Sequence, residues 1–394
     1  MKKKASLTII FITIFIDLMG FGILIPILPT FASKSLGISD FGIGAIVAVF
    51  SLMQFFFNPM LGNLSDRLGR RPIILVTQLL TAASYIMFSF SNSFMILFLS
   101  RMLAGLGGSN IGVAQAYIAD ITTKEERAKG MGMIGAAFGL GFVFGPIIGA
   151  LLSKYGYHVA GFASAAFSFT AFIFALFMLP ESNFKKESTA KRRLKIFDAA
   201  YTKKILTHPE IGLLIILFFI IVFSMANIYG TFAILGYKVY HFSDQQNGML
   251  FGIVGIVSAI IQGGLMRYLS NKFNDRSLIL TGTILMTLGL GFIPYGINFS
   301  GVSMVISVLA IGTGILQPTI PGMISKVSPE DEQGSILGIN QSFSALARVL
   351  GPLWGGFSYD FIGYQFPFLT GAFFTIVTFL LSYYFLKSER LVEV

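Results

Sequence analysis

Twelve apolar runs, each about 20 residues long, constrain the fold of this chain more than any other feature. A run of that length crosses the hydrocarbon core of a bilayer as an α-helix, which satisfies its backbone groups within one segment. The 394 residues are 55% apolar and 12% charged, whereas a soluble domain is about 25% charged. The expected spans are residues 7–31, 42–61, 73–91, 94–118, 130–152, 159–179, 211–235, 247–266, 278–297, 301–324, 335–358 and 364–386. Two short joints, at 91–93 and 298–300, leave open whether one long helix replaces a pair of spans.

The distribution of basic residues predicts the orientation of these spans. A net charge of +10 would suggest nucleic-acid binding in a soluble protein. With the N-terminus placed inside, however, 23 of the 28 Lys and Arg residues fall in cytoplasmic segments, against Lys34, Lys154 and Lys238 outside. This is the positive-inside pattern. We therefore expect both termini in the cytoplasm of a bacterial-type cell. The expected partner of the basic segments is the bilayer, not nucleic acid.

Composition also excludes several chemistries. The chain has no Cys, so it forms no disulfide and has no thiolate nucleophile or cysteine metal site. His158, His208 and His241 lack metal-ligand spacing, and no Gly-x-x-x-x-Gly-Lys-[Ser/Thr] phosphate loop occurs. We expect no metal, no cofactor other than a proton gradient, and no enzymatic activity.

A charged turn joins the second and third spans. It reads Gly62-Asn63-Leu64-Ser65-Asp66-Arg67-Leu68-Gly69-Arg70-Arg71-Pro72. The turn resembles the signature loop of the major facilitator superfamily, Gly-x-Leu-x-Asp-Arg-x-Gly-Arg-Arg. We expect a cytoplasmic gate in which Asp66, Arg67, Arg70 and Arg71 reach Asp120 and hold one of two conformations. Positive charges that only fix the topology are the alternative, and both roles can hold.

A basic segment, Glu181–Glu210, divides the spans into six and six. The halves match at an offset of 206 residues, because Gly145-Pro146-x-x-Gly149 recurs as Gly351-Pro352-x-x-Gly355. The expected fold is an all-α membrane protein with twelve transmembrane helices in two pseudo-symmetric six-helix bundles, at 1–180 and 210–394, joined by a cytoplasmic linker at 181–209. The resemblance places the substrate site between two such repeats, near the midplane.

Asp17 is the one acid expected near mid-bilayer. It lies ten residues beyond Leu7, about 15 Å along a helix axis. An acid at this depth is costly unless it faces a partner or a cavity, so a proton-carrying role is the first hypothesis. The alternative is a paired acid that only packs helices.

The run Asp17-x-x-Gly20-x-Gly22-x-x-x-Pro26-x-x-Pro29 resembles the first-helix motif of twelve-span drug/proton antiporters and is similar to that of tetracycline/proton antiporters. Those exporters carry further acids in their third and ninth spans and a His in the eighth, which are missing here. The resemblance therefore does not extend to tetracycline as the substrate.

Two further motifs support the same resemblance. Arg101, followed by Gly105 and Gly107, resembles the fourth-helix motif implicated in proton transfer; snorkelling to the outer interface is the alternative. The fifth span resembles the antiporter motif of exporters, although Ala150 replaces its final glycine. The expected helix-packing residues of that motif are Gly141, Gly145, Pro146 and Gly149.

Polar residues inside the spans are the candidates for substrate binding, although each could instead form a helix–helix hydrogen bond. They are Gln54, Asn58, Asn110, Gln115, Asn227, Tyr229, Asn340, Gln341 and Arg348. Met and aromatic residues around few charges would suit an adaptable, amphiphilic ligand.

These features predict a monomeric, proton-coupled efflux transporter of lipophilic drugs or related amphiphilic small molecules, working by alternating access. Asp17 would carry the proton and Arg101 would modulate it. An exporter or flippase of an endogenous metabolite, sugar or lipid is the nearest alternative. A membrane receptor or scaffold is disfavoured, because it needs neither an intramembrane acid nor a duplicated gate.

The topology is testable with single cysteines at Lys34, Asn183 and Asp244, because the chain has none of its own. A membrane-impermeant thiol reagent applied to intact cells should label positions 34 and 244 and leave 183 unlabelled. Labelling of position 183 would reverse the predicted orientation.

Overall fold

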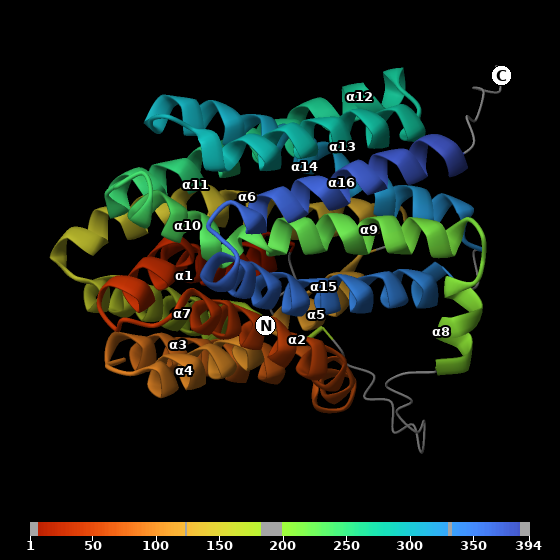
Figure 1. The fold of residues 1–394 in the computed structure, drawn as a ribbon. Helices are drawn as coiled ribbons and strands as arrows, with labels where there is room; N and C mark the ends of the chain where they lie inside the picture. The colour runs from red at the N-terminus through yellow and green to blue at the C-terminus, as the bar shows by residue number, and fades with distance from the viewer. Residues whose placement is uncertain (1–6, 123, 183–198, 330–332, 387–394) are drawn as a thin grey trace. The chain divides into compact units, whose positions relative to one another are not determined.

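The computed structural model describes residues 7–122, 124–182, 199–329 and 333–386. Their regular secondary structure is entirely helical (Figure 1). The helices are α1 (Leu7–Lys34), α2 (Asp40–Leu68), α3 (Arg70–Ser89), α4 (Phe94–Gly107), α5 (Asn110–Ile121), α6 (Lys124–Leu152), η1 (Ser153–Tyr155), α7 (Tyr157–Met178), α8 (Ala199–Leu206), α9 (Ile211–Ala226), α10 (Ile228–Lys238), α11 (Asp244–Ala259), η2 (Ile260–Leu265), α12 (Met266–Lys272), α13 (Asp275–Phe292), η3 (Ile293–Tyr295), α14 (Phe299–Val327), α15 (Gln333–Phe361) and α16 (Phe366–Phe385).

Eleven helical segments of the described residues are long and apolar enough to cross a membrane. Some combine consecutive helices, such as α4 with α5 over Phe94–Ile121 and α9 with α10 over Ile211–Lys238. The remaining expected span, 335–358, lies in α15, a helix of 29 residues that is less apolar because it carries Asn340, Gln341 and Arg348.

Both ambiguous joints separate two helices, and side-chain caps explain why. Ser93 accepts a hydrogen bond from the backbone N–H of Ile96 at 3.4 Å, where α4 begins. Asn298 accepts one from the N–H of Gly301 at 2.9 Å, where α14 begins. Ser and Asn are preferred N-caps, since their side-chain oxygens bind N–H groups that have no partner inside the helix.

The chain forms two compact units. Of the described residues, unit 1 contains 7–38, 45–122, 124–182 and 242–252, and unit 2 contains 39–44, 199–241, 253–329 and 333–386. The expected boundaries at 180 and 210 stay a prediction, because 183–198 of the expected linker lie outside the described residues. Residues 199–206 of that linker form α8.

Unit 1 is built around α1, which packs against α6 and α7, while α3 packs against α4 and α7. Its apolar core includes Ile14, Ile74 and Tyr117, all at most 1% exposed. Glycines allow the closest approach: a Cβ at Gly145 of α6 would meet the backbone of Gly22 in α1, and one at Gly149 would meet Ile23. Such glycine contacts bring helix backbones together where no water drives association.

Unit 2 repeats this arrangement with the matching motif. α15 packs against α9, and Gly351 and Gly355 of α15 face the backbone of Asn227, where α9 meets α10. α13 packs against α14 and α16. The two glycine motifs found 206 residues apart in the sequence therefore make equivalent helix contacts, each within its own unit.

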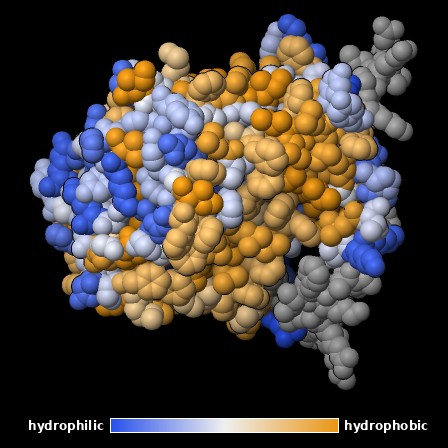
Figure 2. All heavy atoms as spheres, viewed as in Figure 1, coloured by the Kyte–Doolittle hydropathy of each residue, from blue (hydrophilic) through white to orange (hydrophobic). Residues whose placement is uncertain are grey.

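Apolar side chains also cover the outside of the helices. On the face seen in Figure 2, they cover the middle of the region where Figure 1 labels α9 and α16, and hydrophilic residues gather toward the helix ends. Phe373, Ile376 and Leu380 of α16 are 60%, 44% and 46% exposed. Exposed apolar surface of this kind suits contact with lipid.

The α1–α6 contact predicts different losses of stability for two glycine substitutions in α6. Gly145→Ala should lower the free energy of unfolding by about 1–3 kcal/mol, because the new methyl meets backbone that cannot move aside cheaply. Gly139→Ala in the same helix is the control, since no atom lies within 4 Å of a Cβ there. Thermal unfolding of the purified variants in detergent would measure the difference. Equal melting temperatures would show that the α1–α6 contact adapts to a larger residue.

Candidate functional site

Asp17 lies inside unit 1, where three helices meet. Its side chain belongs to α1 and is buried, with the residue 7% exposed. The Ser168 hydroxyl of α7 donates a hydrogen bond to Oδ1 at 2.7 Å, and the Asn110 amide of α5 donates one to Oδ2 at 3.0 Å. Hydrogen bonds to both oxygens stabilise a carboxylate that burial would otherwise disfavour.

Arg101 is buried on α4 and has no carboxylate partner among the described residues. Its guanidinium lies over the Phe50 ring, 4.9 Å from the centroid, and its Nε has no hydrogen-bond partner in the described part of the chain. Tyr85 of α3 interacts electrostatically with both Arg101 and Asp17. Tyr85 is therefore a common neighbour of Asp17 and Arg101, which form no direct ion pair with each other in the described part of the chain.

Arg70 is the centre of the charged cluster between α2 and α3. Its Nη1 lies 2.6 Å from Oδ1 of Asp66, and its Nε lies 3.0 Å from Oδ2 of Asp120 on α5. Nη1 also donates to the Ser65 hydroxyl at 2.7 Å, and Ser182 donates to Asp120 at 2.9 Å. The Arg70 side chain is only 10% exposed. The structure thus brings Asp66, Arg70 and Asp120 together.

Glu181 binds the start of α3 in the same cluster. Its carboxylate accepts hydrogen bonds from the backbone N–H groups of Arg70 at 2.9 Å and Arg71 at 3.2 Å. These groups lack partners inside the helix, and the positive end of the helix dipole favours the acid. Gly69 precedes them with φ 105°, and a Cβ there would collide with the Glu181 carboxylate. Glycine is therefore required at this position for two independent reasons.

The other residues of the signature loop take different places. The Arg71 guanidinium donates to the carbonyl of Leu176 at 2.6 Å, and among the described contacts it forms no ion pair with Asp120. Arg67 is exposed, and among the described residues it forms no ion pair with Asp120. A Cβ at Gly62 would meet open space, so this glycine is not required by packing.

The substrate candidates of unit 1 divide into bonded and unbonded residues. Gln54 donates to the carbonyl of Gly108 at 3.1 Å, and Asn110 bonds to Asp17, so both hold helices together. Asn58 has a buried side-chain oxygen with no hydrogen-bond partner among the described residues. Gln115 is exposed on α5.

The candidates of unit 2 divide in the same way. The Asn227 amide donates to the carbonyl of Pro367 and, at 3.2 Å, to the Thr370 hydroxyl, which fixes the α9–α10 junction against α16. Asn340 is buried, with a side-chain oxygen that has no partner in the described part of the chain. Gln341 is exposed on α15, whereas Tyr229 and Arg348 are partly buried and interact electrostatically with each other.

A third charged cluster, made of Asp40, Lys238 and Asp360, was not predicted from the sequence. Within unit 2, Lys238 lies 2.8 and 2.9 Å from the two carboxylate oxygens of Asp40. Asp360 caps the start of α2 by accepting the N–H groups of Asp40 at 3.2 Å and Phe41 at 2.7 Å. A sequence signal existed only for Asp40, an acid at the start of a span, because the partners come from distant helices.

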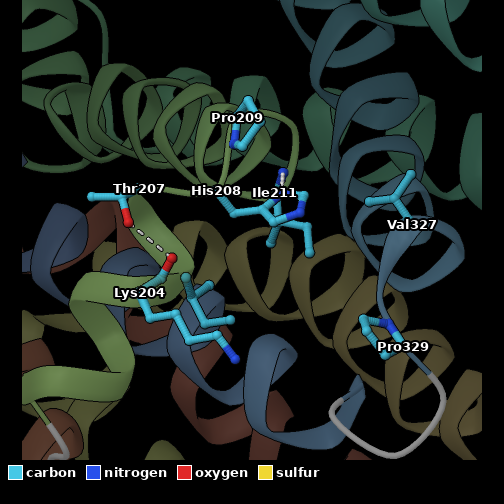
Figure 3. A pocket seen from close by; sticks show the side chains of 8 residues that line it. Lys204, Thr207, His208, Pro209, Ile211, Val327 and Pro329 are labelled. Atoms are coloured by element: carbon cyan, nitrogen blue, oxygen red, sulfur yellow. Dashed lines mark hydrogen bonds between the residues drawn. The ribbon is translucent and has the colours of Figure 1, made fainter.

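A pocket of about 470 Å³ lies in unit 2, between the α8–α9 turn and the end of α14 (Figure 3). Inside it, the Thr207 hydroxyl donates to the carbonyl of Lys204 at 3.0 Å, and the N–H of Ile211 donates to His208. The pocket is lined by Lys204, Ile205, Thr207, His208, Pro209, Ile211, Val327 and Pro329. It lies at helix ends, away from the mid-helix residues considered for transport. Within the described ranges, no group of His, Asp and Glu could hold a metal ion.

Comparison with known proteins adds independent findings. The family model of the Major Facilitator Superfamily matches residues 10–296 and 264–393. The tetracycline resistance protein, class E, of Escherichia coli is 30% identical over 89% of this chain and 86% of its own length. Multidrug resistance protein 1 of Bacillus subtilis is 31% identical over 94% of each chain.

Solved structures show the same fold. A nucleoside transporter superposes with a TM-score of 0.82 at 14% identity, covering 97% of this chain and all of that one. The human organic anion transporter MFSD10 superposes with a TM-score of 0.73 at 24% identity, covering 95% and 98%. The prediction of an all-α membrane fold of this superfamily is confirmed by these matches and by the helices above.

The Arg70 cluster gives a stability prediction with a neighbouring control. Arg70→Ala should lower the free energy of unfolding by about 1.5–3 kcal/mol, because Asp120 and Ser65 lose a charged hydrogen-bond partner. Arg67→Ala removes an equal charge from an exposed position of the same loop and should leave stability nearly unchanged. Thermal unfolding of both variants would compare them. If Arg67→Ala were the more damaging change, the loop would depend on net charge rather than on the Arg70 contacts.

Proposed function

Because this chain belongs to the major facilitator superfamily, we propose that it is a proton-coupled efflux transporter of lipophilic drugs or related amphiphilic molecules, working by alternating access. It is a multi-pass membrane protein, and its relatives are transporters rather than enzymes. The names of the tetracycline and multidrug resistance relatives support export of foreign compounds. In this proposal it acts as a monomer in the cell membrane with both termini in the cytoplasm.

Asp17 is the observation that carries the proposal. Its carboxyl group lies ten residues into α1, about 15 Å along the helix, with a hydrogen bond on each oxygen. An intramembrane acid is a functional residue by default, because its ionised form is costly at that depth. Burial disfavours the charged form of the carboxyl group, and the two hydrogen-bond donors favour it. We assign it the role of proton carrier.

Arg101 and Tyr85 are proposed to modulate that proton. Arg101 is a buried cation stacked on Phe50, with no carboxylate partner of its own among the described residues. Tyr85 lies within electrostatic range of both residues, and in this proposal it links the protonation of Asp17 to Arg101.

The Arg70 cluster is proposed as the cytoplasmic gate. Arg70, Asp66 and Asp120 form short ion pairs in unit 1, and Glu181 fixes the start of α3 beside them. A gate needs contacts that form in one conformation and break in another, and partly exposed ion pairs are suited to this. In this proposal the packing glycines of α6, Gly141, Gly145 and Gly149 with Pro146, keep α1 in place during the change.

Tetracycline itself is not proposed as the substrate. The described α3 has no acid, and its hydroxyl residues Thr77, Thr81 and Ser84 bond to carbonyl groups of their own helix. Without those acids, the chain lacks the groups that the related exporters offer to a metal–drug chelate. An exporter or flippase of an endogenous metabolite, sugar or lipid is the alternative, and uptake of labelled compounds into vesicles would separate it from drug export.

Coupling can be tested with Asp17→Asn in proteoliposomes that hold a pH gradient and a panel of lipophilic fluorescent dyes. Wild type should concentrate at least one dye, and the variant should lose gradient-driven accumulation, by about tenfold or more, while still exchanging dye down its own gradient. Asp275→Asn is the control, since Asp275 pairs with Lys326 at the start of α13, 2.7 Å away. Concentrative transport by Asp17→Asn would place the proton site elsewhere.

A further inference from the structure

Arg348 is a cation at the middle of a membrane helix. It lies fifteen residues beyond Gln333, about 22 Å along α15, and the helix is about 43 Å long. Its side chain is too short to reach either end of the helix, so snorkelling does not explain its position. An Arg at this depth is among the costliest residues to keep in a membrane protein, and it usually marks a partner or a pathway.

No acid in the described part of the chain neutralises this charge. Among the described residues, Arg348 has neither an ion pair nor a hydrogen bond, and its one electrostatic neighbour is the hydroxyl of Tyr229. The described acids of unit 2 all lie at helix ends. They are Asp40, Glu210, Asp275 and Asp360. The closest in sequence, Asp360, is twelve residues away, about 18 Å along the same helix.

Arg348 belongs to the packed pair of helices α9 and α15, which also carries aromatic side chains. Gly351 lies three residues further along the same face of α15 and packs on Asn227 at the α9–α10 junction, two residues before Tyr229. Arg348 and Tyr229 are both partly exposed residues, so neither is sealed completely within the packed interior of unit 2. Phe343 on α15 and Phe219 on α9, with ring centroids 6.3 Å apart, are partly exposed too.

We propose that Arg348 and Tyr229 bind an anionic group of the substrate, a carboxylate, sulfonate or phosphate carried by an apolar body. The guanidinium fork matches these groups with two parallel hydrogen bonds, and the phenol adds a donor. The aromatic side chains of α9 and α15 receive the apolar part. This assignment rests on the proposed function, because it names the chemical class of the exported molecule. A cation without a protein partner would favour substrates that carry a negative charge.

The proposal is tested by binding, which needs neither a gradient nor turnover. The chain has one tryptophan, Trp354, six residues from Arg348 on α15, and its Nε1 donates to Thr370 at 3.0 Å. Intrinsic tryptophan fluorescence therefore comes from a single residue, which lies about 9 Å from Arg348 along the axis of α15. The protein in lipid nanodiscs is titrated with octanesulfonate, with its uncharged analogue octanesulfonamide, and with octyltrimethylammonium.

Wild type should bind octanesulfonate at least tenfold more tightly than either of the other probes. Arg348→Gln should lose that preference, Arg348→Lys should keep part of it, and Tyr229→Phe should weaken octanesulfonate binding a few-fold. Arg276→Gln is the control for loss of a cation, because Arg276 bonds to the carbonyl of Tyr383 at 2.6 Å, at the start of α13.

Two results overturn the assignment: equal affinity of wild type for the three probes, including no binding of any, or an unchanged preference in Arg348→Gln. The wild-type comparison stands even if a variant fails to fold. Anion binding without proton-driven export would instead contradict the proposed function and leave this site in place. Export of dyes without a preference for anions would contradict the anion site and leave the proposed function in place.

Discussion

The low polarity of the bilayer is the constraint on which the rest of this structure depends. Every backbone group in a span must be bonded within its helix, so the fold is helical and its helices differ mainly in their few polar side chains. In water, a residue such as Asp17 or Arg348 would be unremarkable on a surface. At the middle of a membrane helix, each of these residues needs a partner or a cavity that offsets the cost of its charge.

The charged residues solve this problem in three ways. Asp17 uses neutral donors from α5 and α7, so its charge is stabilised without being cancelled. Arg70 uses acids at the membrane boundary, where water still screens the pairs. Arg348 uses neither, and its one electrostatic neighbour is a phenol. The arrangement of Asp17 suits a group that titrates, and that of Arg70 suits a contact that breaks. The arrangement of Arg348 suits the binding of a ligand of opposite charge.

Much of the fold was predictable, because the apolar runs and caps are local signals. The runs place the helices, and Ser93 and Asn298 mark where a new one begins. The partners of the charged groups were not predictable, because they lie far away in the sequence. Glu181 meets Arg70 across 111 residues, Ser168 meets Asp17 across 151, and Asp360 meets Asp40 across 320. Nothing in the local sequence of Ser168 distinguishes it from the other hydroxyl residues of its span.

The two hydrogen bonds on Asp17 are not equivalent, and the difference matters once a proton binds. A carboxyl group that gains a proton becomes a donor on one oxygen. On Oδ1 the neighbour is the Ser168 hydroxyl, which accepts as readily as it donates after a simple rotation. On Oδ2 the neighbour is the Asn110 amide nitrogen, which only donates, so the whole amide must turn over or let go. A proton on Oδ1 is thus accommodated by rotation of one hydroxyl, whereas a proton on Oδ2 requires the Asn110 amide to turn over or to release its hydrogen bond between α1 and α5.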